Sequence, residues 1–86
     1  FWKLMKDQNG CCALTGRQLT PDNTEVELKE PYKEKGRTEF SNHYLILRSL
    51  AFMARYASED EIIQTAIEIV QHRGKEKGYG IKKIKR

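Results

Sequence analysis

The sequence predicts a small α+β domain: a β-hairpin knuckle packed on two α-helices, followed by a basic C-terminal tail. Residues 25–28 alternate polar and apolar side chains, as in a half-buried strand. Between residues 46 and 70, apolar side chains recur at helical spacing in two stretches separated by Ser58. The 86 residues suffice for one domain with a thin core.

The N-terminal half contains the predicted hairpin. Residues 1–7 mix apolar and basic side chains and are expected to end a helix that begins upstream. The chain opens on Phe1 rather than Met, as expected of a piece of a longer protein. After a turn signal at residues 8–10, residues 11–14 are predicted to form one strand and residues 25–28 the other. The expected inward side chains are Cys12 or Ala13, Leu14, Leu19, Val26 and Leu28.

The C-terminal half contains two predicted helices after a charged loop at residues 29–39. The first is expected to begin near Leu47 or Arg48. The second opens on a capping box, with Ser58 as N-cap and Glu61 three residues later, and Gly74 is the expected stop. The inward positions are predicted to be Ile46, Leu47, Leu50, Met53, Ala54 and Ala57 in the first stretch, and Ile62, Ile63, Ala66, Ile67 and Val70 in the second.

The net charge of +4 is concentrated at the C-terminus. Residues 1–72, the predicted domain, carry nine basic and eleven acidic side chains, a net charge of −2, whereas residues 73–86, the predicted tail, carry seven against one, a net charge of +6. Such a run suits the phosphates of DNA or RNA, although a solvated terminus has the same composition. The basic side chains of the tail are Arg73, Lys75, Lys77, Lys82, Lys83, Lys85 and Arg86.

Composition and cysteine usage favour an intracellular protein, either cytoplasmic or in the nucleoid. The chain is 38% hydrophobic and 33% charged, and its apolar runs are far too short to cross a bilayer, so no membrane partner is expected. Cys11 and Cys12 are adjacent and are the only cysteines in the chain, which excludes a four-cysteine zinc site and a disulfide framework. One of the two is expected to be a small core residue.

An ordered set of short motifs resembles the HNH endonuclease family, most closely the domain appended to group II intron reverse transcriptases (maturases). These motifs are Cys12-Ala13-Leu14-Thr15-Gly16, Leu19-Thr20-Pro21-Asp22-Asn23, Glu25-Val26-Glu27-Leu28 and Lys35-Gly36-Arg37-Thr38-Glu39-Phe40-Ser41-Asn42. The resemblance covers roughly residues 8–62 and implies a ββα-metal fold with a role in engaging DNA. It also implies that the chain is part of, or partner to, a larger nucleic-acid enzyme.

The departures from the family pattern affect its chemistry. The family's His-His pair would follow Leu28, where this chain has Lys29-Glu30, and its later histidines would fall near Leu47, Ala51 and Arg55. Phosphodiester hydrolysis needs a base that titrates near neutral pH and a cation that stabilises the leaving oxygen. The resemblance thus implies a ββα-metal fold without its metal. The remaining catalytic candidates are Asn42 and its neighbour His43, and no cofactor is expected unless the nuclease is active with Mg²⁺ or Mn²⁺.

The role of two further groups of side chains has more than one interpretation. Arg48, Phe52, Arg55 and Tyr56 share a helix face, which could contact phosphates and stack on bases or simply cover a partner. Glu27, Glu30, Glu34 and Glu39 could bind Mg²⁺ or pair with neighbouring basic side chains.

Three functions follow from this sequence. The favoured one is a nucleic-acid-binding, catalytically impaired HNH-like module. The alternatives are an active HNH-type endonuclease with a rewired metal site, and a protein-interaction domain without a nucleic-acid role.

Overall fold

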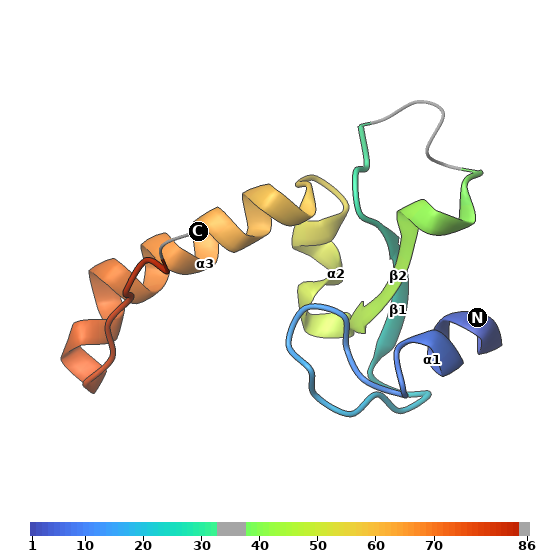
Figure 1. Ribbon diagram of the computed structural model, residues 1–86, viewed down its shortest axis with the longest axis horizontal. Coiled ribbons are helices and arrows are strands. Elements are labelled where there is room, and N and C mark those ends of the chain that lie inside the picture. Colours follow the sequence, from blue (N-terminus) through green and yellow to red (C-terminus); the bar gives the residue numbers. More distant parts are fainter. Residues whose placement is uncertain (33–37, 85–86) are drawn as a thin grey trace.

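The computed structural model describes residues 1–32 and 38–84 and confirms the small α+β class (Figure 1). Its two strands pair antiparallel, with Val26 opposite Leu45. Figure 1 shows one helix on each side of this hairpin and a long helix that leads away from it. In chain order, the elements are α1 (Trp2–Asp7), β1 (Thr24–Leu28), η2 (Phe40–Asn42), β2 (His43–Leu47), α2 (Arg48–Ala54), α3 (Glu59–Arg73) and η3 (Gly74–Lys77).

The second strand of the hairpin lies at residues 43–47, so the strand predicted at residues 11–14 is wrong. Residues 11–14 contribute only an isolated bridge between Cys11 and Gln18. In the sequence, Ile46 and Leu47 fit the helical spacing of the apolar side chains that follow them. A strand that is covered on both faces has a continuous apolar sequence, which periodicity alone does not distinguish from a buried helix.

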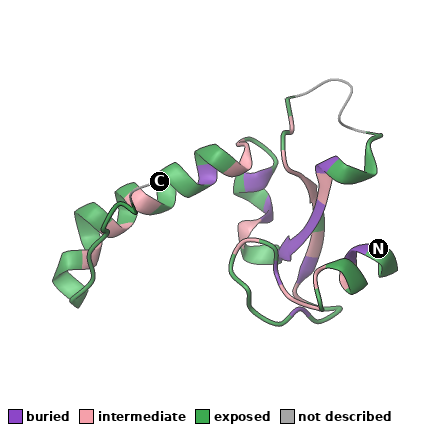
Figure 2. Ribbon diagram, viewed as in Figure 1, coloured by how far each residue is buried: buried purple, intermediate pink, exposed green. Residues whose placement is uncertain are grey.

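β2 forms the centre of the core. Tyr44, Leu45 and Ile46 are almost completely buried, and Leu4, Cys12, Leu19, Leu47, Ala54 and Ile62 pack around them. The burial of Cys12 and Leu19 confirms two of the predicted inward positions, whereas Ala13 is exposed. Figure 2 shows the buried residues gathered along β2 and the adjoining side of α2.

Val26, another predicted core residue, is 42% exposed. Its neighbours Glu25 and Glu27 lie on the opposite face of β1, where they form ion pairs with Arg48 of α2 and with Arg55 just after α2. Alternation therefore directs Val26 to the face where α1 packs against β2. β1 is the less covered strand on that face, and so Val26 stays partly in solvent.

The start of α2 at Arg48 and the capping box of α3 are confirmed. Ser58 Oγ accepts a hydrogen bond from the Glu61 amide (3.2 Å), and Glu61 Oε1 accepts one from the Ser58 amide (2.9 Å). This pairing satisfies two amides that a helix start leaves without intrahelical partners.

Most of the predicted inward face of α3 is not buried. Of the predicted residues only Ile62 is buried, while Ile63 and Ala66 are exposed and Ile67 and Val70 are partly exposed. The reason is visible in Figure 1, where α3 extends past the hairpin and α2 instead of lying across them. None of the helices in residues 1–32 and 38–84 is long and apolar enough to span a bilayer.

Gly74 is the C-cap of α3, which ends at Arg73, so the predicted stop is confirmed. It keeps a right-handed helical conformation, and the chain continues through η3 to Gly78, which is left-handed at φ 86°. The Tyr79 amide donates to the Gly74 carbonyl (2.9 Å) and the Gly78 amide to the Lys75 carbonyl (3.2 Å). These two bonds form a Schellman motif, which favours glycine at the position that Gly78 occupies.

Candidate nucleic-acid interface

Asn42, a predicted catalytic residue, is positioned as a structural link. It is 8% exposed at the end of η2. Its Oδ1 accepts from the Glu30 amide (3.1 Å), and its Nδ2 donates to the Glu30 carbonyl (3.4 Å). The side chain therefore joins the segment that leaves β1 to the segment that enters β2. Both ends of its amide contribute to this closure of the loop.

His43 lies beside Asn42 with its ring oriented by the backbone. Its Nδ1 is 2.7 Å from the Glu39 carbonyl oxygen. Because a carbonyl only accepts, Nδ1 carries the proton and a neutral ring presents Nε2 as an acceptor. The ring is thus held in one tautomer, as a general base requires.

The surroundings of Asn42 are acidic rather than basic. A cleft of about 220 Å³ beside it is lined by Glu30, Glu59 and Asp60 together with Lys29 and Ser58. Within the part of the chain that the structure describes, no three His, Cys, Asp or Glu side chains are grouped so that they could hold a metal ion. Of the carboxylates considered from the sequence, Glu34 lies outside the described residues. The negative charge of this cleft does not favour the binding of phosphate groups.

The predicted recognition face of α2 is partly engaged in holding the fold together. Arg48 Nε is 3.0 Å from Glu25 Oε1, and Arg55 Nε is 3.2 Å from Glu27 Oε2. The two ion pairs connect α2 and the residue after it to β1. The Glu27 carboxylate is engaged in one of these pairs. Both arginines remain about half exposed, so solvent screens these pairs and each contributes little stability, although the Glu27 side chain is only 13% exposed.

The two aromatic residues of this face are solvent-exposed. Phe52 is 73% and Tyr56 is 61% exposed, and their ring centroids lie 5.3 Å apart. The hydroxyl of Tyr32 donates to the Tyr56 carbonyl. The structure therefore brings together the four side chains named from the sequence, with the arginines turned toward β1.

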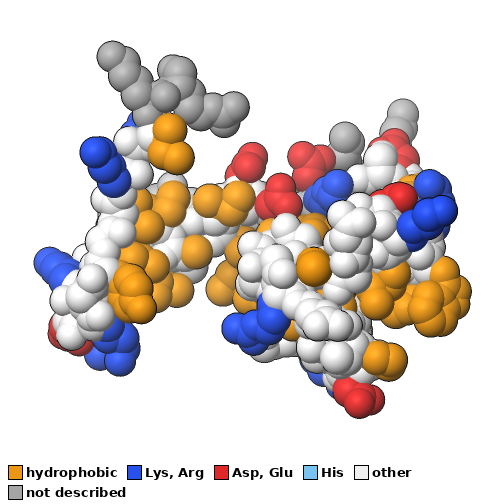
Figure 3. Space-filling view, turned by 60° about the horizontal axis from the view of Figure 1, so that its bottom comes forward, with side chains coloured by type: hydrophobic (Ala, Val, Ile, Leu, Met, Phe, Trp, Pro, Cys, Tyr) orange, Lys and Arg blue, Asp and Glu red, His pale blue; other side chains and the backbone are white. Residues whose placement is uncertain are grey.

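The remaining predicted residues lie at the outer end of α3 and in the tail that returns along it (Figure 1). The side chains of Arg73, Lys75 and Lys77 are exposed at that end, and those of Lys82 and Lys83 are exposed beside the middle of α3, where they line a groove with Ile63 and Ile67. Lys85 and Arg86 lie outside the described residues. In Figure 3, basic side chains surround this end of the molecule and apolar side chains line α3 beside them. Glu76 pairs with Arg73 at 3.4 Å, with both side chains about two-thirds exposed.

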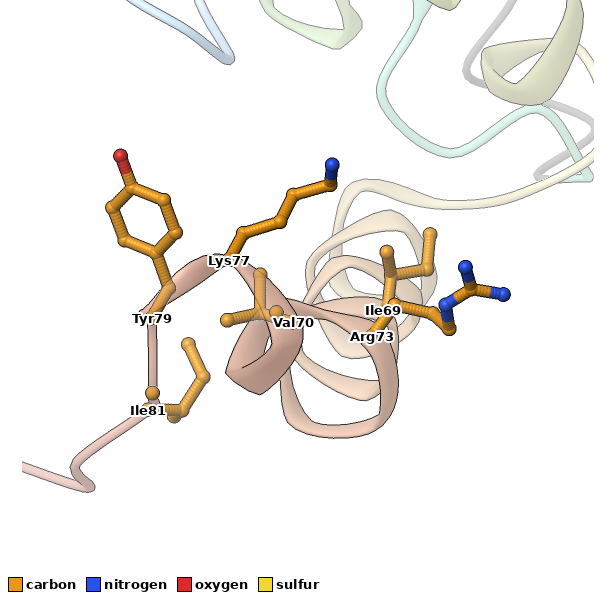
Figure 4. Close-up of a pocket in the computed structure, with 8 residues that line it drawn as sticks. Ile69, Val70, Arg73, Lys77, Tyr79 and Ile81 are labelled. Atoms are coloured by element: carbon orange, nitrogen blue, oxygen red, sulfur yellow. The ribbon is translucent and has the colours of Figure 1, made fainter.

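The tail turns back at Gly78 and forms a groove with the end of α3 (Figure 4). We call it the C-terminal groove. Its volume is about 480 Å³, and its lining is almost entirely apolar apart from two cationic side chains. The lining residues are Ile69, Val70, Arg73, Gly74, Lys77, Tyr79, Gly80 and Ile81.

The sequence predicts the charges at this end of the chain but not the groove. The missed signal is the spacing of Gly78, four residues after Gly74, with Tyr79 and Ile81 following it. A glycine that ends a helix and is followed by apolar residues indicates a chain reversal with a hydrophobic contact.

Comparison of the chain with protein-family models, with curated proteins and with solved structures found no significant match.

Proposed function

We propose that the chain is a nucleic-acid-binding, catalytically impaired HNH-like module that belongs to, or works with, a larger nucleic-acid enzyme. In this proposal the basic residues 73–86 make the main contact with the phosphate backbone. The observation that carries it is the separation of charge. The net charge is +6 in these residues and −2 in the rest of the chain, and the described basic side chains of this segment are exposed.

The architecture supports the HNH-like part of the proposal. β1, β2 and α2 follow one another in the order of a ββα unit, and Asn42 stands at the entrance to β2. The expected His-His position after Leu28 has Lys29 and Glu30, and the adjoining cleft is acidic. With Lys29 and Glu30 in place of the imidazoles, that position lacks a base that titrates near neutral pH, which favours binding over cutting.

The binding test measures the salt dependence of the affinity for single-stranded and duplex oligonucleotides. A variant with Lys75→Gln, Lys82→Gln and Lys83→Gln removes three positive charges from the proposed interface. Its matched control, with Lys3→Gln, Lys6→Gln and Arg17→Gln, removes three exposed charges elsewhere, so both variants have the same net charge. For single strands, the interface variant should flatten the slope of log K against log salt by about 2, while the control changes it little.

Two outcomes would contradict this proposal. One is the absence of binding at about 50 mM salt, where phosphate contacts are strongest. The other is an equal loss in both variants, because affinity would then follow net charge rather than the C-terminal residues.

The impaired chemistry is tested on the same oligonucleotides with Mg²⁺ or Mn²⁺ added. We expect them to stay intact. Cutting that is lost in His43→Ala but kept in His72→Ala would instead establish the active nuclease, because His43 is the histidine whose ring is held in one tautomer. His43 is a better probe than Asn42, since changing Asn42 also removes the bonds that close the loop.

A further inference from the structure

The C-terminal groove is built by local sequence rather than by chance packing of a loose end. The Schellman motif at Gly78 reverses the chain, so that Tyr79 and Ile81 return beside α3. At Gly74, a Cβ would stand 2.9 Å from Val70 Cγ1, so a side chain there would crowd the Val70 wall of the groove, whereas its distance of 3.6 Å from Tyr79 Cβ is ordinary contact. The left-handed backbone at Gly78 favours glycine, and the reversal there brings an aromatic ring next to the end of the helix.

The groove has the dimensions and lining of a site for one flat group. Its volume of about 480 Å³ lies within the range of roughly 300–1,000 Å³ that is common for small-molecule sites. Ile69, Val70 and Ile81 provide aliphatic walls, and Tyr79 adds a ring that is 69% exposed. An aromatic ring system would bury its faces in such a lining more effectively than a polar or charged group.

The rim of the groove is cationic. Arg73 and Lys77 belong to the lining, and Figure 4 shows both side chains extending outward from the end of the helix and the turn that follows. The pairing of Arg73 with Glu76 is solvent-exposed, so exchanging it for a phosphate costs little. Lys82 and Lys83 continue the positive charge along the tail, beside a second groove between the tail and α3.

An apolar lining with two cationic side chains matches a nucleotide, with its base inside the groove and its phosphate beside Arg73 or Lys77. We propose that the C-terminal groove receives an unpaired base of the bound strand, so that the chain prefers single-stranded nucleic acid over a perfect duplex. This inference rests on the proposed function and specifies its substrate. A paired base is stacked within its duplex, and entry into the groove would require it to be unstacked and unpaired first.

The test compares three labelled oligonucleotides of equal length: a single strand, the matching duplex, and a single strand with abasic sites that keeps every phosphate. The single strand should bind the whole 86-residue chain most tightly at equal salt. Tyr79→Leu should weaken that binding roughly 5- to 150-fold, which corresponds to the loss of one stacked base, and should leave the abasic strand unaffected. Tyr79→Phe should restore the affinity.

Trp2→Leu is the matched control, because Trp2 is 78% exposed on α1 and does not line the groove. It should bind like the unmodified chain. If the three oligonucleotides bind equally and Tyr79→Leu has no effect, the base site is refuted while phosphate binding by the tail stands. If none of them binds, the proposed function fails and the base site with it. Circular dichroism checks that the variants retain their helices.

Discussion

Tyr44 is a buried side chain whose polar group is not accommodated by the core. It is 1% exposed, and its hydroxyl finds no hydrogen-bond partner within residues 1–32 and 38–84. Burial, together with the negative charges of Glu59 and Glu27, raises the pKa of Tyr44 to about 12. A buried hydroxyl without a hydrogen-bond partner lowers the free energy of unfolding, so the chain is less stable with tyrosine at this position than it would be with phenylalanine.

Tyr44→Phe should therefore leave the free energy of unfolding at pH 7 unchanged or raise it by up to about 2 kcal/mol. The clearer effect is expected at alkaline pH. Because the pKa is raised from 10 to about 12 in the folded chain, the unfolded chain loses the proton first, and stability falls as the pH rises through this window. The variant should lack that part of the fall, which amounts to about 1.4 kcal/mol at pH 11.

Urea denaturation at pH 7 and at about pH 11 measures this difference. Tyr79→Phe, at an exposed tyrosine, serves as the control and should keep the alkaline loss of the unmodified chain. An equal alkaline loss in Tyr44→Phe would show that other groups cause it.

Among the elements, α1 packs on the hairpin through Leu4, and the side chain that follows the helix adds hydrogen bonds to β2. Gln8, just after α1, accepts from the Leu45 amide through Oε1 and donates to the Leu45 carbonyl through Nε2, both at 2.9 Å. Its Nε2 also donates to the Cys11 carbonyl at 2.9 Å. The amide of Gln8 thus pairs with the outer edge of β2 as a neighbouring strand would.

Gln8→Ala should lower the free energy of unfolding by about 1–3 kcal/mol, because the buried Leu45 amide loses its partner. Thermal or urea denaturation measures the change. Gln71→Ala, on the exposed surface of α3, is the comparison and should have little effect. Equal stability of Gln8→Ala and the unmodified chain would mean that water replaces the side chain.

The sequence predicted correctly the start of elements that have a local signal, such as a helix-capping motif. The capping box from Ser58 to Glu61 placed the start of α3, and Arg48 was correctly placed at the start of α2. The strand His43–Leu47 was not predicted because it is buried on both faces, so its side chains are apolar in a continuous run and do not alternate. Burial on both faces depends on the tertiary structure. The link from Gln8 to Leu45 spans 37 residues, and a single sequence carries no signal for it.

The candidate site was predicted unevenly for similar reasons. Charge is a property of composition, so the basic C-terminus was visible in the sequence. The groove depends on a chain reversal at Gly78, and the roles of Arg48 and Arg55 depend on which strand lies beside α2. These are consequences of packing, and residue spacing alone does not provide them.

At the scale of the whole molecule, the hairpin with α1 and α2 forms the packed body and α3 extends from it (Figures 1 and 2). Hydrogen exchange should reflect this division. Amides of Leu45 and Ile46, which are completely buried, should exchange slowest, and those of α3 beyond Ile62 should exchange much faster. Equal protection along α3 would indicate that its exposed apolar face is covered in solution by another copy of the chain.

The central claim is that the chain contacts nucleic acid through its C-terminal residues rather than around Asn42. Amide chemical shifts of the full chain, followed by NMR during titration with a single-stranded oligonucleotide at low salt, test it most directly. The account predicts shifts confined to residues 69–84 that diminish as salt is added. Shifts centred on Asn42 and His43, or none at all, would contradict it.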